Sequence, residues 1–144
     1  MKKLYLFILI GAFLFPLTGQ AFAASQPATT SVIDSKKAVT AALQDIFTQL
    51  TALSTKTQTT INQLNATGVA TDNAQTAIID ANTTLAKAKI DIDAFSTINT
   101  SNKNPSLTLS TLKYTAITAE NTLSAAKSHI IDSLTNLKAS LPSL

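Results

Sequence analysis

An apolar repeat with alternating steps of three and four residues is the feature that most constrains how this chain can fold. It is most regular between Ala74 and Phe95, where the steps are 4, 3, 4, 3, 4 and 3. The repeat consists of Ala74, Ile78, Ala81, Leu85, Ala88, Ile92 and Phe95. This spacing is the period of an α-helix that packs along one stripe. Alanine at alternate positions predicts that the helix approaches a neighbour closely.

Similar repeats on either side predict two further long helices. The first repeat consists of Val32, Val39, Leu43, Ile46, Leu50, Leu53, Ile61 and Leu64. The last consists of Leu109, Leu112, Ala116, Ala119, Leu123, Ala126, Ile130, Leu134, Leu137 and Leu141. Most steps are again three, four or seven residues, so each stripe lies on one face of a helix.

Local signals place the helix ends. Gly68 is expected to end the first helix in the left-handed conformation. Asp72, followed by Gln75, is expected to cap the second helix with its side chain. Proline at the first helical position predicts that the third helix begins at Pro105, and Pro142 is expected to end it.

These signals predict helices over residues 31–66, 72–100 and 105–140. Short connections make successive helices antiparallel, so the fold class is all-α, an elongated antiparallel three-helix bundle spanning residues 31–141. Further apolar residues beside the stripes are expected to widen them until each helix can contact two neighbours. They include Phe47, Ile79, Ile90, Ile117 and Ile131.

The first 23 residues have the three parts of a secretory signal peptide. Lys2 and Lys3 precede an apolar run over residues 4–17, and Ala21-Phe22-Ala23 forms a small-x-small cleavage site. The run of 14 residues is shorter than the roughly 20 of a membrane helix. Cleavage after Ala23 is therefore predicted, with an uncleaved anchor as the alternative. The chain has no cysteine, which excludes a lipid anchor on that residue.

The remainder is predicted to be an exported protein, periplasmic or extracellular. Residues 24–30 are polar and contain Pro27, so they are expected to form a flexible leader. Beyond residue 23 the chain contains no Cys, Arg, Trp or Met, one His, one Gly, and nine lysines against eight acids. Nucleic-acid binding requires a concentrated basic surface, and phosphate cradles require glycine-rich backbone. Neither nucleic acid nor a cofactor is implied.

His129 is the only imidazole in the chain. Asp132, three residues on, shares its helical face, but metal sites usually need three or four ligands. Nucleophilic catalysis would need an oriented base beside a hydroxyl, and Ser128 points elsewhere on the helix. A solvated surface pair is therefore expected, with no metal ligand and no catalytic residue.

Two aspartates follow lysines at a spacing of four residues. Asp91 and Asp93 are two residues apart, so they diverge on a helix, whereas Lys87 and Lys89 precede them by four residues each. Surface ion pairs are expected at both spacings, and the aspartates are not expected to act as an acid/base pair.

The segment from Ile61 to Lys89 combines the end of one helix, a Gly turn followed closely by Thr-Asp, and an alanine-spaced helix. It resembles the helical hairpin of uncharacterised exported helical-bundle proteins of candidate-phylum bacteria. With the third helix entered through x-Pro, the likeness covers about Lys36 to Leu137. This chain carries less Lys, Arg and Glu than those proteins. The resemblance implies no activity and no site residue.

The sequence favours a non-catalytic structural or interaction module of the cell envelope or exterior. Its helix faces would bind a protein or an envelope component, and self-association remains open. Uncharged threonine and asparagine side chains on these faces are consistent with an adhesive surface or with composition alone. The alternative is a small periplasmic chaperone or stress protein that binds unfolded or apolar substrates, which would expose an apolar groove. An enzyme would need polar groups that converge in a pocket, and the stripes offer none.

Overall fold

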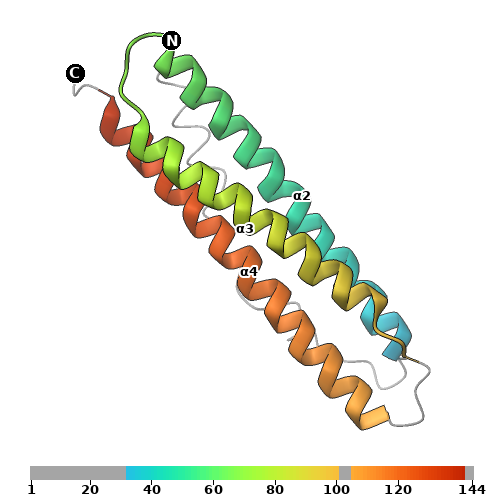
Figure 1. Ribbon diagram of the computed structural model, residues 1–144. Coiled ribbons are helices and arrows are strands. Elements are labelled where there is room, and N and C mark those ends of the chain that lie inside the picture. The colour runs from blue at the N-terminus through green and yellow to red at the C-terminus, as the bar shows by residue number, and fades with distance from the viewer. Residues whose placement is uncertain (1–31, 101–104, 142–144) are drawn as a thin grey trace.

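The computed structural model of the chain describes residues 32–100 and 105–141, which contain three α-helices and no β-strand (Figure 1). The helices are α2 (Val32–Asn65), α3 (Asp72–Thr97) and α4 (Pro105–Ser140). The prediction of an all-α three-helix fold is confirmed. The predicted signal peptide (1–23), leader (24–30), connection over 101–104 and stop at Pro142 lie outside the described residues.

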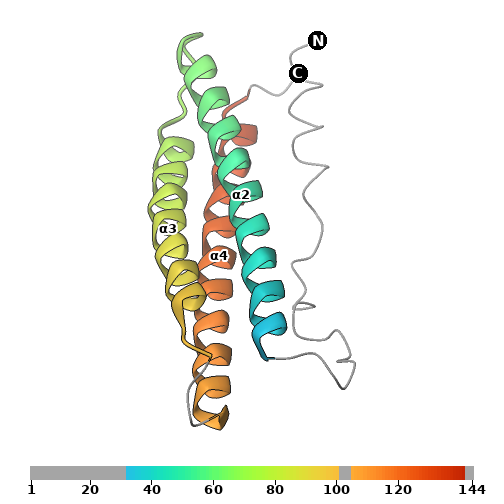
Figure 2. The same cartoon turned by 90° about the vertical axis from the view of Figure 1, so that its right-hand side faces the viewer.

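The three helices lie side by side along one long axis (Figures 1 and 2). α3 runs antiparallel to both α2 and α4, so the start of α2, the end of α3 and the start of α4 lie at the same end. α4 is the longest helix, with 36 residues, which corresponds to about 54 Å at 1.5 Å per residue. The described part of the chain is therefore an elongated bundle.

Gly68 ends α2 as expected. Its φ is 81°, in the left-handed region that residues other than glycine rarely adopt. The Val69 N–H donates to the Leu64 carbonyl at 3.1 Å, and the Gly68 N–H donates to the Asn65 carbonyl at 3.0 Å. These two bonds form a Schellman motif, which satisfies the last carbonyls of α2 and turns the chain towards α3.

The start of α3 differs from the prediction. Thr71, not Asp72, occupies the N-cap position, and no side chain caps the first amides of the helix. The Thr71 hydroxyl instead donates to the side-chain oxygen of Asn65 at the end of α2. The prediction was wrong because the buried Thr71 side chain joins the two helix ends, which leaves Asp72 as the first helical residue.

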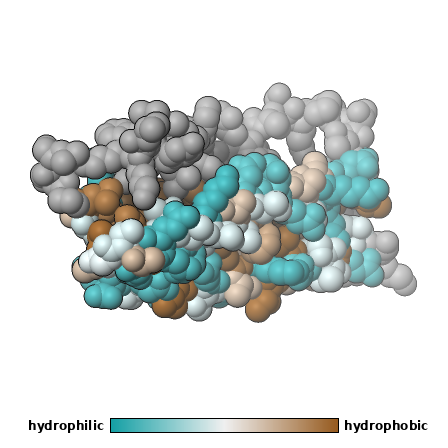
Figure 3. Space-filling model, turned by 90° about the horizontal axis from the view of Figure 1, so that it is seen from above, coloured by the Kyte–Doolittle hydropathy of each residue, from teal (hydrophilic) through white to brown (hydrophobic). Residues whose placement is uncertain are grey.

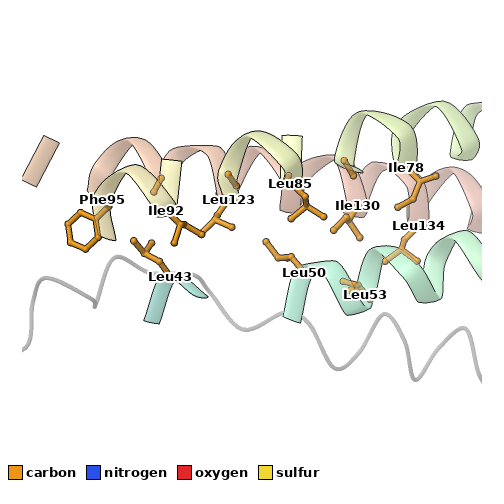
Figure 4. Packing of buried hydrophobic residues seen from close by; sticks show 14 of the residues in the cluster. Leu43, Leu50, Leu53, Ile78, Leu85, Ile92, Phe95, Leu123, Ile130 and Leu134 are labelled. Atoms are coloured by element: carbon orange, nitrogen blue, oxygen red, sulfur yellow. The ribbon is translucent and has the colours of Figure 1, made fainter. Parts of the chain in front are cut away.

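One continuous core runs along the bundle (Figure 4). All seven apolar positions of the α3 repeat are buried, including Ala74, Ala81 and Ala88. α3 packs against α4 more extensively than α2 packs against either helix. Alanines of α4, such as Ala119 and Ala126, are also fully buried. Both helices therefore contribute small side chains where the packing between α3 and α4 is most extensive. α2 contributes mainly leucines, including Leu43, Leu50 and Leu53.

Two repeat positions near helix starts are not buried. Val32 is 41% exposed and Leu109 is 57% exposed. In α4 the buried stripe begins at Thr108, which is 6% exposed and lies four residues before Leu112. Leu109 is rotated away from the stripe, and Val32 is the first residue of its helix.

The expected widening of the stripes is also wrong for four of the five residues. Ile79, Ile90, Ile117 and Ile131 are 53%, 67%, 40% and 46% exposed, and only Phe47 packs partly against the core. Because alanine side chains let α3 and α4 approach closely, a narrow apolar stripe on each helix is wide enough to contact both neighbouring helices. The isoleucines therefore remain on the outer faces of α3 and α4.

Candidate functional site

His129 lies on α4 and is half-buried. Asp132 is exposed, and the two side chains form neither an ion pair nor a hydrogen bond within the described part of the chain. The expected solvated pair is therefore absent there. Among the described residues, no group of three or more His, Cys, Asp or Glu side chains could hold a metal ion.

One of the two expected ion pairs is present. The Lys89 ammonium lies 2.8 Å from the Asp93 carboxylate, and both side chains are more than half exposed. A pair of this kind contributes about 0.3–0.5 kcal/mol. Asp91 does not bind Lys87 but accepts a hydrogen bond from the Thr122 hydroxyl of α4 at 2.7 Å. The aspartate that faces α4 therefore joins two helices.

Uncharged polar side chains join α2 to α3. The Ser54 hydroxyl donates to the Asn82 side-chain oxygen. The amides of Gln58 and Gln75 exchange two hydrogen bonds, at 2.8 and 3.3 Å. Each such bond contributes about 0.5–1.5 kcal/mol net, and each requires one relative position of the helices. These contacts specify the alignment of α2 on α3.

A buried hydroxyl also joins α4 to the backbone of α3. Ser133 is fully buried, and its hydroxyl donates to the Ala74 carbonyl at 2.8 Å. No buried side-chain polar atom in the described residues lacks a hydrogen-bond partner. Sequence reasoning missed Ser54 and Ser133. The sequence signal that could have identified them is their position directly beside a buried repeat residue, because Ser54 follows Leu53 and Ser133 precedes Leu134.

Threonine hydroxyls on the helices mostly bond to their own helix. Within the described residues, thirteen of them donate only to the carbonyl four residues earlier, as Thr55 does to Thr51 at 3.0 Å, whereas Thr122 shares its proton between the Thr118 carbonyl and Asp91. A hydroxyl in this arrangement has used its one proton. The outer surface therefore presents threonine methyl groups and oxygen acceptors in place of free donors.

Large apolar side chains interrupt this polar surface. The most exposed are Tyr114 at 75% and Ile90 at 67%. On the face shown in Figure 3, the hydrophobic residues (brown) form separate groups between hydrophilic (teal) and intermediate (white) ones and do not form one continuous patch. Ile79 and Ile90 belong to α3, whereas Tyr114 and Ile117 belong to α4. These outer faces, and not a group of reactive side chains, are the candidate functional surfaces.

Within residues 32–100 and 105–141, no helix combines the length and the hydropathy needed to cross a bilayer.

The chain matches no protein-family model, and no curated protein and no solved structure is significantly similar to it.

Proposed function

We propose that this protein is an exported, non-catalytic helical module that binds a macromolecular partner, a protein or an envelope component, through its outer helix faces. Export is inferred from the signal-like arrangement of residues 1–23. After cleavage the protein would act in the periplasm or outside the cell.

The observation that carries this proposal is the exposure of large apolar side chains that the core does not use. Tyr114 is 75% exposed, and Ile117, three residues later on α4, is 40% exposed. Tyrosine is enriched in protein interfaces, where its ring buries a large area at a small cost in side-chain entropy. The extended α4 face around Tyr114 therefore suits a partner surface better than a small ligand.

Site-specific photo-cross-linking in the producing cell tests this proposal. A photoreactive amino acid is placed at Tyr114 and, as a matched control, at Thr55, an exposed residue of α2. We expect a defined adduct with one partner from position 114 and none from position 55. With that partner identified, Tyr114→Ser should weaken binding at least about fivefold, which corresponds to about 1 kcal/mol.

Two results would contradict the proposal. One is an equal, diffuse set of adducts from both positions, because it indicates non-specific proximity. The other is turnover of a substrate by the purified protein. An adduct whose mass equals two copies of this chain would instead identify the α4 face as a self-contact and not as the binding site of another partner.

A small periplasmic chaperone is the second candidate, and the same exposed side chains favour it. Chaperones bind unfolded chains through apolar surface that remains exposed in the folded protein. The discriminating experiment measures aggregation of a reduced, unfolded model protein with and without this chain. Suppression at equimolar ratio that is lost in an Ile90→Ser, Tyr114→Ser double variant favours the chaperone. No suppression eliminates it.

A further inference from the structure

The side of α3 that faces away from the core carries a second row of residues with helical spacing. Its members are Thr76, Ile79, Thr83, Ala86 and Ile90, separated by 3, 4, 3 and 4 residues, and all five are exposed. We call these five residues the outer row. In Figure 2, α2 and α4 both lie on one side of α3, so neither helix covers this row.

We propose that the outer row is a self-association surface, on which a second copy of this chain packs its own α3 in the opposite direction. The proposal is independent of the partner surface around Tyr114, because the two faces belong to different helices. It makes the functional unit a dimer of two bundles.

The part of the outer row from Ile79 to Ile90 has steps of 4, 3 and 4 residues and is therefore complementary to itself when it is reversed. If Ile79 lies opposite Ile90 of the second copy, the same alignment places Thr83 opposite Ala86 and Ile90 opposite Ile79. Thr83 donates its hydroxyl proton to the Ile79 carbonyl at 3.0 Å, so its methyl group remains available for packing. Isoleucines then form the two ends of the contact, and small residues at the centre allow the helices to approach closely.

Charges beside the outer row support the same alignment. Asp80 follows Ile79 and Lys87 follows Ala86, so both occupy the same flank of the row. Both residues are exposed, and their side chains form no ion pair or hydrogen bond within residues 32–100 and 105–141. In an antiparallel helix pair equivalent flanks face each other, so Asp80 lies opposite Lys87 of the second copy.

Two-fold symmetry repeats this pairing, because Lys87 then lies opposite Asp80 of the second copy. On the other flank Asn82 lies opposite Lys89, which places no like charges together. A two-fold interface uses the same patch on both copies and therefore requires a self-complementary patch. The outer row from Ile79 to Ile90 and its flanks meet this requirement in shape and in charge, and this is why we assign a second copy as the occupant.

Charge exchange tests both the association and its direction. The purified protein is compared with Asp80→Lys and with Lys87→Asp by sedimentation equilibrium over a range of concentrations. We expect the parent to form dimers and each variant to dissociate at least about tenfold more readily, because two like-charged pairs replace two opposite pairs. Asp45→Lys and Lys56→Asp, at exposed positions of α2, are the matched controls and should leave the dimer unchanged.

Mixing the two variants gives the most specific result. In a mixed dimer the lysine introduced at position 80 of one variant faces the aspartate introduced at position 87 of the other. The native Lys87 of the first variant then faces the native Asp80 of the second. Both contacts are attractive, so equimolar mixing should restore dimers of mixed composition, detected by native mass spectrometry. Ile90→Asp should abolish association in every combination, while circular dichroism shows the helicity of the parent.

Three outcomes would overturn the proposal. They are a parent protein that is monomeric at every concentration, a dimer that Asp80→Lys and Lys87→Asp do not weaken, and variants that fail to form a mixed dimer. Loss of partner binding on Tyr114→Ser with an unchanged dimer would leave this proposal standing. Conversely, if the charge variants lose the dimer but bind the partner as the parent does, the proposed function would still stand.

Discussion

Replacing Gly68 with alanine isolates the contribution of a single backbone conformation. Gly68 has a φ of 81°, and a Cβ added there meets no atom within 4 Å. Steric overlap with the rest of the protein therefore contributes nothing to the cost. What remains is the intrinsic penalty of the left-handed region for an alanine, about 1–2 kcal/mol.

The unfolded chain offsets part of that penalty. Alanine restricts the unfolded state more than glycine does, which favours folding by about 0.4–1 kcal/mol. The expected net effect of Gly68→Ala is a loss of about 1 kcal/mol, or a decrease in Tm of about 4 °C for a domain of this size. Gly68→Asn should cost less, because asparagine tolerates positive φ better than other residues.

Urea denaturation followed by circular dichroism measures this effect. A stability change alone shifts the midpoint and leaves the slope m unaltered. If Gly68→Ala equals or exceeds the parent in stability, or if Gly68→Asn costs more than Gly68→Ala, the left-handed turn does not determine how α2 ends.

Three further predictions concern the core, the histidine and the export signal. Alanine at Leu50, Leu85 or Leu123, each no more than 4% exposed, should cost about 2–5 kcal/mol in denaturant unfolding, and a loss under about 0.5 kcal/mol at all three would refute the core assignment. His129→Ala should retain helicity and partner binding, and a stoichiometric metal that disappears with it would contradict the non-enzymatic proposal. Mass spectrometry of the exported protein should find a chain that begins after Ala23, and intact protein in the membrane fraction would contradict cleavage.

The helical class and the core face of α3 could be predicted because its repeat is unbroken. All seven positions from Ala74 to Phe95 are buried, and Gly68 has the expected positive φ. Hydrophobic spacing identifies which side of a helix packs, and glycine identifies a turn that other residues disfavour. Both signals are local in the sequence, so no knowledge of the neighbouring helices was needed.

The breadth of each buried face could not be predicted in the same way. It depends on how closely the helices approach, which is a property of two helices together. Ile90 was expected to be covered and is 67% exposed, because the alanine contact between α3 and α4 leaves no neighbour on its side. Ser54 and Ser133 were missed for a related reason, since hydrophobic periodicity does not report hydrogen bonds between helices.

The sequence predicted only what kind of surface the candidate site would be, not which residues form it. Uncharged outer faces and the isolated His129 pointed away from acid-base chemistry, but which residues stay exposed required the structure. Tyr114 lies on the outer face of α4 beside Lys113, and its ring carries no sequence signal that distinguishes an interface residue from a core residue.

The unequal interfaces of the bundle also determine the order in which it opens. α2 packs less extensively than α3 and α4 pack against each other, so α2 should detach before the α3–α4 pair separates. Such partial opening occurs at a lower free energy than global unfolding and appears as faster amide hydrogen exchange in one helix. Slowly exchanging amides should then concentrate around Ala81 and Ala126, while those of α2 exchange earlier. The α3–α4 hairpin would thus be the last part of the molecule to lose its structure.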